Sequence, residues 1–266
     1  MEATQIREFS GRTFTTEKIG LVKEVAAICT GLSQSELANT VCELIGWTQP
    51  NGKPKTVQCV QFLRRLDKEG ELALPSLNER VGSGRRTIGI MATKDRSWID
   101  TSEMRECGSI SLEVIRPGDG LRQWRAYMGE YHRLGDPNVY GNQIRYMIKT
   151  GVGRDLGCML FSASSWALAP REEWIGWSHS GRKARLHLVV NQSRFLIFPW
   201  IRIQNLASRA LSMAARRIQA DWLEAYCYAP VLLETFVDSS LYKGTCYKAA
   251  NWIYLGETQG RGRQDR

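Results

Sequence analysis

The sequence predicts a mixed α+β protein with a helical N-terminal part and a larger α/β part. Residues 17–70 place apolar side chains at helical spacing, whereas from residue 109 onward short apolar runs typical of strands alternate with helical patterns. Strands interleaved with helices indicate an α/β sheet that is covered on both faces. We therefore expect an N-terminal domain over residues 1–86, a linker over residues 87–108 and an α/β domain over residues 109–266.

Composition and charge favour a folded protein with an anionic partner. The 266 residues are 43% hydrophobic, and no apolar run approaches the roughly 20 residues of a membrane-spanning helix. The first residues show no signal-peptide pattern, and seven scattered cysteines fit free buried thiols better than a disulfide framework or a zinc site, so we expect a cytoplasmic protein. A net charge of +9 favours nucleic acid as the partner, and the alternative is a basic enzyme without one.

The N-terminal domain carries the pattern of two helices joined by a turn. A capping box at residues 33–36 predicts the start of one helix, which ends at Gly46, and proline and glycine in residues 49–54 form a turn. A second helix is predicted over residues 55–69, with an apolar inner stripe of Cys59, Phe62, Leu63 and Leu66. Residues 71–75 predict a short strand.

The order of these elements is that of a winged helix: helix, turn, helix, strand and then a basic glycine-rich loop. Residues 81–86 would form the wing. Glutamine, arginine and lysine are the side chains that contact base edges and phosphates. We therefore expect a winged-helix-like DNA-binding domain, and the alternative is a helical cap with an ordinary solvated face. The expected nucleic-acid contacts are Lys53, Lys55, Gln58, Gln61, Arg65, Lys68, Arg85 and Arg86, together with Arg261 and Arg263 of a Gly/Arg-rich C-terminal tail.

The second domain alternates strands and helices. The expected strands are residues 109–116, 143–149, 156–162, 194–199, 231–237 and 253–255. The expected helices are residues 121–132, 172–177, 182–190, 205–226 and 245–252.

Eight short segments dispersed over this domain resemble the DruA family of Druantia anti-phage defence systems, relatives of which also accompany bacterial transposases. The segments are YHxLG at 131–135, LGCMLFS at 156–162, WIGWS at 174–178, LHLVVNxSRFLI at 186–197, NLAS at 205–208, ETFVD at 234–238, GTCYxAANW at 244–252 and GxTxGRGR at 256–263. The resemblance implies DNA-related work in a bacterial defence system or a mobile element. Together with the basic helix-turn-helix pattern, it favours a component that recognises DNA for a partner helicase or nuclease. It implies no catalytic residue.

The order of strand 194–199, a loop and a long helix from residue 205 also resembles the GNAT acyltransferase fold. In that fold the helix N-terminus holds the pyrophosphate of the cofactor, so the resemblance implies an anion site at Asn205 and Ser208. Residues 200–207 contain no glycine, which argues against coenzyme A and leaves the cofactor unknown. The second domain is therefore expected to be GNAT-like in topology.

Four residues are candidates for catalysis. His132 is a candidate general base, and its alternative role is to cap a helix. Glu234 lies in an apolar strand that Asp238 ends, so the two acids are candidates for catalysis or metal binding, and the alternative for Glu234 is an ion pair with Arg194. The acyltransferase resemblance implies a general acid at Tyr247.

These candidates define a second function, that of an enzyme acting on nucleic acid as a group transferase or a metal-dependent nuclease. If strands 194–199 and 231–237 are adjacent and parallel, one phosphate-binding pocket would collect the residues Asn205, Ser208, Glu234, Asp238 and Tyr247.

Overall fold

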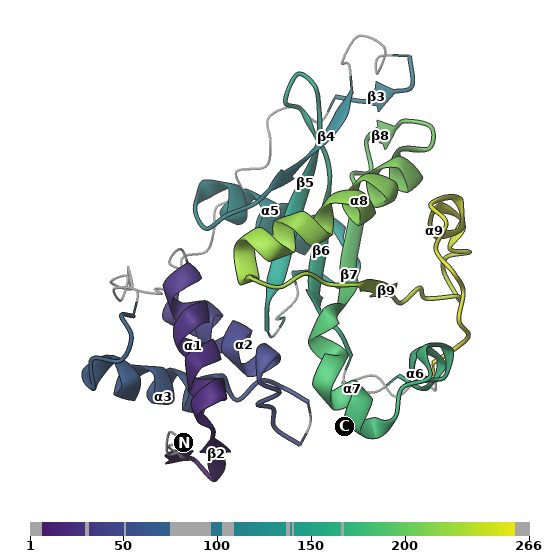
Figure 1. Ribbon diagram of the computed structural model, residues 1–266. Coiled ribbons are helices and arrows are strands. Elements are labelled where there is room, and N and C mark those ends of the chain that lie inside the picture. The colour runs from purple at the N-terminus through teal and green to yellow at the C-terminus, as the bar shows by residue number, and fades with distance from the viewer. Residues whose placement is uncertain are drawn as a thin grey trace.

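The computed structural model describes residues 7–29, 32–50, 52–74, 97–102, 109–136, 139, 141–165 and 168–258. Over these residues the chain is a mixed α+β protein, with N-terminal helices beside a five-stranded sheet (Figure 1). Each part has a hydrophobic core of its own.

The N-terminal part begins with an antiparallel hairpin of β1 (Arg7–Phe9) and β2 (Arg12–Phe14), followed by α1 (Thr16–Ile28), α2 (Gln34–Leu44) and α3 (Thr56–Lys68). The expected capping box of α2 is confirmed, since Ser33 Oγ accepts from the Glu36 N–H and Glu36 accepts from the Ser33 N–H. The expected inner stripe of α3 is buried. Residues 71–74, expected to begin a strand, form none, and the expected wing lies outside the described residues.

The sheet has the strand order β4-β5-β6-β7-β9. Three antiparallel pairings join β4 (Ile110–Val114), β5 (Gln143–Thr150), β6 (Asp155–Ala163) and β7 (Val189–Ile197). The last strand, β9 (Leu232–Thr235), runs parallel to β7, but it pairs with residues 189–192 and not with residues 194–199, which were expected to lie beside it. Their pairing ends at Gln192 and Thr235, while β7 continues to Ile197.

Helices cover both faces of the sheet. On one face Tyr146 donates to Asp221 of α8 (Leu206–Tyr226) over 2.5 Å, and on the other Arg145 lies over the Trp124 ring of α5 (Asp119–Tyr131). Because Arg145 and Tyr146 are neighbours in a strand, they point to opposite faces. Figure 1 shows α8 crossing the front of the sheet with α5 behind it.

Three short helices and a 3₁₀ turn also belong to the second part. The helices are α6 (Ala169–Ile175), α7 (His179–Arg185) and α9 (Thr245–Ala249), and a 3₁₀ turn follows α7 at Leu186–Leu188. The helix expected over residues 182–190 is therefore wrong at its end. Val189 and Val190 belong to β7, which pairs with β6 and β9. Both side chains are buried in the sheet, and β-branched residues favour such a strand. Residues 253–255 form no strand.

Part of the expected linker belongs to the sheet part. β3 (Ile99–Asp100) pairs in parallel with β8 (Ile201–Arg202), and Ile99 is fully buried in the larger core. The local sequence does not indicate a pairing between residues about 100 positions apart. For this reason residues 87–108 were expected to form a linker.

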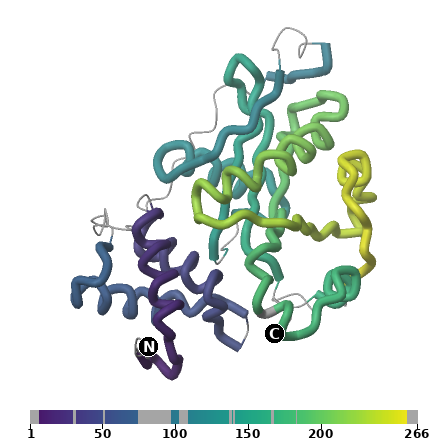
Figure 2. Tube along the Cα trace, in the orientation of Figure 1, coloured from purple at the N-terminus to yellow at the C-terminus, as the bar shows by residue number. Residues whose placement is uncertain are grey.

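Figure 2 shows the N-terminal helices beside the sheet part. The two parts are joined by polar side chains and a disulfide. Asn142 bonds Thr40 through its side chain and donates its N–H to Glu43, and Tyr228 also donates to Glu43. Cys29 and Cys227 form a disulfide, which corrects the expectation that every cysteine is a free thiol. We call Thr40, Glu43, Asn142 and Tyr228 the junction cluster.

Candidate functional site

The single pocket expected around Glu234 and Tyr247 does not form, because the two side chains lie on opposite faces of the sheet. Glu234 and Thr235 are successive residues of β9, so they point to opposite sides. Thr235 bonds Gln192 on the same face as Tyr247, whose hydroxyl donates to Gln192 Oε1 over 2.7 Å. β7 and β9 are neighbours in the sheet, although through residues 189–192 of β7, and the face that each side chain occupies separates the candidates.

Glu234 is held by an ion pair with Arg171 of α6. Its Oε2 lies 2.9 Å from Arg171 Nη1, and its Oε1 accepts from the Ser165 N–H over 3.1 Å. Arg171 is fully buried and also lies 3.4 Å from Glu172, which pairs with Arg182 over 2.6 Å. The partner expected from sequence was Arg194. Helix α6 supplies the arginine instead, so this acid has the role of a buried counter-ion.

The remaining catalytic candidates are also engaged. Asp238 is exposed, pairs with Arg133 over 2.8 Å, and has its pKa lowered chiefly by a hydrogen bond from Ser240. Burial raises the pKa of Tyr247 to about 12, so the phenol stays protonated and serves as a donor to Gln192.

His132 lies at the C-cap of α5, where its Nδ1 accepts from the Leu134 N–H over 3.1 Å. Burial, aided by the charges of Arg194 and Arg133, lowers the pKa of His132 to about 4. The imidazole is therefore neutral at neutral pH, with its proton on Nε2. This is the helix-capping alternative that the sequence left open.

The predicted anion site at the start of α8 lies at the edge of a basic groove. Asn205 precedes the helix in a left-handed conformation, and the Ser208 hydroxyl donates to its carbonyl over 3.1 Å. Ser208 lines a groove of about 350 Å³. Ser212 and Met213 of α8 and Ala249 of α9 line the same groove. The groove also carries Arg209 and Arg216, which are exposed and form no ion pair with the described residues. Sequence reasoning named the serine but missed both arginines, although they share its helical face.

The outer face of α3 is exposed as expected at Gln61, Arg65 and Lys68. Arg65 pairs with Glu69 over 2.9 Å, and Gln58 is partly buried. Lys53 and Lys55 lie partly buried in the turn before α3. The other expected contacts, Arg85, Arg86, Arg261 and Arg263, lie outside the described residues.

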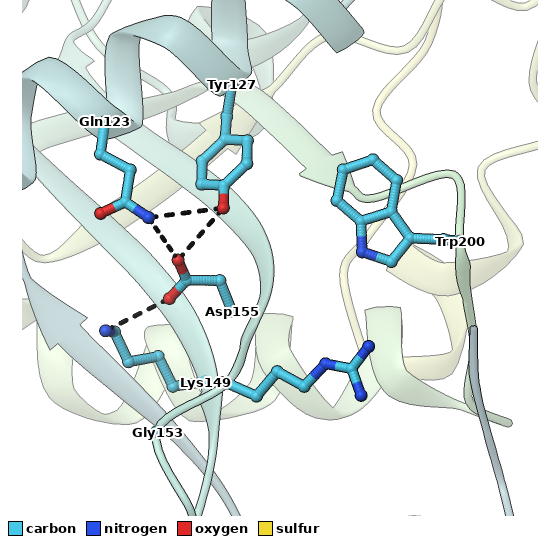
Figure 3. A pocket seen from close by; sticks show the side chains of 7 residues that line it. Gln123, Tyr127, Lys149, Gly153, Asp155 and Trp200 are labelled. Carbon is cyan, nitrogen blue, oxygen red and sulfur yellow. Dashed lines mark hydrogen bonds and ion pairs between the residues drawn. The ribbon is translucent and has the colours of Figure 1, made fainter. Parts of the chain in front are cut away.

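A second cavity, of about 310 Å³, lies between α5 and the end of the β5–β6 hairpin (Figure 3). Asp155 is its central group and accepts from Gln123 over 2.9 Å and from Tyr127 over 3.4 Å. Lys149 pairs with the other carboxylate oxygen over 3.2 Å, and Trp200 lines the opposite side. Sequence reasoning did not single out this cavity, whose only local signal is an acid at the start of an otherwise buried strand.

Within the described residues, no group of three or more histidine, cysteine or acidic side chains is arranged to hold a metal ion. Nor is any helix in this part of the chain both long and apolar enough to cross a membrane.

A family model described as Druantia protein DruA matches residues 90–266, about two thirds of the chain. The chain belongs to the DruA family. The match begins before β3 and takes in every later element, whereas α1–α3 precede it. Membership of this family links the chain to Druantia anti-phage defence, in agreement with the resemblance of the dispersed motifs. No curated protein and no solved structure matches the chain.

Proposed function

We propose that this DruA family member is the DNA-recognition component of a Druantia system and binds the DNA backbone in the groove beside α8, for a partner helicase or nuclease. The observation that carries the proposal is the pair Arg209 and Arg216, two exposed cations that line one groove without an acidic partner among the described residues.

The spacing of these arginines suits a phosphodiester backbone. They lie seven residues apart, which is two helical turns, so both point to one face and their attachment points are about 10 Å apart along the axis. Ser212 lies between them and adds a hydroxyl that hydrogen-bonds to phosphate oxygen. The overall charge of +9 supports the same partner.

The face of α3 is a second candidate DNA contact. Its exposed Gln61, Arg65 and Lys68 are of the types that contact bases and phosphates from a helix, and α2 packs behind α3. Because Glu69 already pairs with Arg65, we expect α3 to contribute less binding energy than the groove beside α8.

A salt titration tests the proposal. Binding of duplex and single-stranded DNA is measured at several salt concentrations for the wild type and for the double variant Arg209→Gln/Arg216→Gln. If both arginines contact phosphates, the slope of log K against log salt becomes shallower by about 2. The variants are expected to fold, because both positions are exposed.

The matched control is Arg116→Gln/Arg122→Gln, which removes the same charge from two other exposed arginines. This control should leave the salt slope within about half a unit of the wild type. If the two double variants change the salt slope equally, DNA binding depends only on the overall charge of the protein. If the wild type binds no DNA at low salt, DNA recognition is refuted.

A further inference from the structure

The face of the sheet opposite α8 carries three arginines brought together from three separate segments. Arg145 of β5 and Arg194 of β7 both pair with Leu160 in the strand between them, so they share one face about 10 Å apart. Arg125 of α5 lies above this face, with its Nε 3.6 Å from Asp136. We call Arg125, Arg145 and Arg194 the arginine cluster.

One carboxylate, that of Asp136, lies within reach of the charges of all three arginines in the described part of the chain. It is not held tightly, since 3.6 Å from Arg125 exceeds hydrogen-bond distance. Burial raises the pKa of Asp136 in spite of the three cations, and burial lowers the pKa values of Arg145 and Arg194. The cluster therefore carries an excess of positive charge in a partly buried place.

The arginines also have hydrogen-bond donors to spare. A guanidinium has five N–H groups. Arg145 donates to Gln143 over 2.8 Å, and its Nε is buried without a hydrogen-bond partner. Arg194 donates to the Ser193 carbonyl over 2.7 Å and to the Gly135 carbonyl over 3.4 Å. Most of the N–H groups in the cluster therefore have no hydrogen-bond partner among the described residues.

The end of α5 adds to this surface without cancelling its charge. His132 is neutral at neutral pH, with its proton on Nε2, and the charge of Arg194 reaches it. Arg133 is already neutralised by Asp238, over 2.8 Å. The surroundings thus supply one more neutral donor. The charge of Glu36 also reaches Arg145, so the three arginines face two carboxylates, those of Asp136 and Glu36, and keep an excess of positive charge.

We propose that the arginine cluster is a phosphate-binding site. Three guanidinium groups with free N–H pairs match the several oxygens of one phosphate, and their convergence from α5, β5 and β7 sets that geometry in advance. A phosphate placed there would take over the excess charge that Asp136 leaves. The site lies on the opposite face from the groove beside α8, so it does not depend on the proposed DNA contact there.

The first test uses inorganic phosphate. The melting temperature is measured in rising phosphate against chloride at equal ionic strength, for the wild type, Arg194→Gln and the control Arg122→Gln. We expect phosphate to raise the melting temperature of the wild type and the control, and Arg194→Gln to lose at least three quarters of that rise. An equal rise in Arg194→Gln, or no advantage of phosphate over chloride in the wild type, would overturn the proposal.

A second variant keeps the test valid if Arg194→Gln folds poorly. Asp136→Asn removes the carboxylate that competes for the arginines, so phosphate should bind at least threefold more tightly to it than to the wild type. Unchanged or weaker phosphate binding by Asp136→Asn would contradict a site at this cluster.

The source of the phosphate is distinguished with three further probes. They are 5′-dAMP, a short single-stranded DNA with a 5′-phosphate, and the same strand with a 5′-hydroxyl. A preference of tenfold for the phosphorylated strand, lost in Arg194→Gln, assigns the site to a terminal phosphate. Equal binding of both strands, weakened in Arg194→Gln but not in Arg209→Gln/Arg216→Gln, assigns it to the strand backbone.

Discussion

At the scale of single residues, the charged side chains inside the protein are explained by their partners. Glu234 lies in the edge strand β9, where an unpaired carboxylate would be costly, and Arg171 lies fully buried beside it. Removing one member of such a pair leaves the other charge uncompensated, whereas removing both does not.

We predict that Glu234→Gln lowers the free energy of unfolding by about 3 kcal/mol, because Arg171 then lacks its main counter-charge. Tyr247→Phe, which loses one hydrogen bond to Gln192, should cost only about 1 kcal/mol. Urea titrations measure both values. The double variant Arg171→Met/Glu234→Leu is the control and should recover most of the lost free energy of unfolding. If Glu234→Gln is as stable as the wild type, the ion pair does not contribute to stability.

Two residues give opposite dependences of stability on pH. Burial raises the pKa of Glu43 from 4.5 to about 7, so the folded state binds more protons than the unfolded state between these values and stability falls as pH rises. The pKa of His132 is lowered from 6.5 to about 4, so there the unfolded state binds more protons and stability rises with pH.

Single variants should separate these contributions. The two contributions oppose each other between about pH 4.5 and 6.5, so removing one residue exposes the contribution of the other. Relative to the wild type, the free energy of unfolding of Glu43→Gln, which keeps the shape of the protonated acid, should rise with pH over this range, because the His132 contribution remains. That of His132→Gln should fall with pH relative to the wild type, because the Glu43 contribution remains. Urea titrations at half-unit steps of pH provide the measurement, and parallel profiles for all three proteins would contradict the assignment.

At the scale of elements, the close approach of β6 and β7 depends on a glycine. A Cβ on Gly157 would lie 2.2 Å from the Leu196 carbonyl oxygen, which belongs to the backbone of the next strand. The chain cannot relieve this contact by rotating a side chain. Gly129 in α5 is the opposite case, since a Cβ there meets nothing within 4 Å.

We predict that Gly157→Ala costs at least about 3 kcal/mol, because it forces two central strands apart. Gly129→Ala should instead stabilise the protein by about 0.5–1 kcal/mol, as alanine is the better helix former. Thermal unfolding of the two variants compares them directly. A mild effect of Gly157→Ala would mean that β6 and β7 are not packed as described.

The elements that follow from local pattern were correctly predicted from sequence. Helix α8 was expected over residues 205–226 and is found at Leu206–Tyr226, since its apolar stripe repeats over six turns. The capping box of α2 is equally local. Residues whose state depends on a distant partner were missed. Ile99 pairs with Ile201, and the partner of Glu234 comes from α6 rather than from the neighbouring strand.

The same distinction explains the functional sites. Ser208 could be named from the start of a helix, but the arginine cluster arises from strand register and from the turn after α5, neither of which the sequence displays. Which face of β9 each residue occupies also depends on pairing, and this is why Glu234 and Tyr247 were expected to meet and do not.

At the scale of the whole molecule, the junction cluster joins the N-terminal helices to the sheet. Asn142 and Thr40 are buried and bonded to each other, and Glu43 accepts from the Asn142 N–H and from the Tyr228 hydroxyl. These bonds satisfy polar groups that would otherwise be buried without a partner.

We predict that Asn142→Ala loosens this contact while the sheet stays folded. The variant loses the side-chain bonds to Thr40 and Tyr228, so hydrogen exchange in α2 should become at least tenfold faster, with exchange in β6 unchanged. Asn39→Ala, which removes the bond from Thr56 within the helical part, is the control and should leave the contact intact. Equal acceleration in α2 and β6 would indicate global destabilisation instead.

The junction cluster also limits how relatives could exchange segments by recombination. A Cβ on Gly141, which has φ +78°, would lie 2.5 Å from Glu43 Oε1, so any other residue there would push the Glu43 carboxylate away from Asn142 and Tyr228. A crossover placed before residue 90, where the family match begins, would separate Glu43 from Gly141 and Tyr228. Chimeras that inherit Glu43, Gly141 and Tyr228 from one parent should fold. Chimeras that combine the helices of one parent with a sheet part that lacks Gly141 or Tyr228 should not.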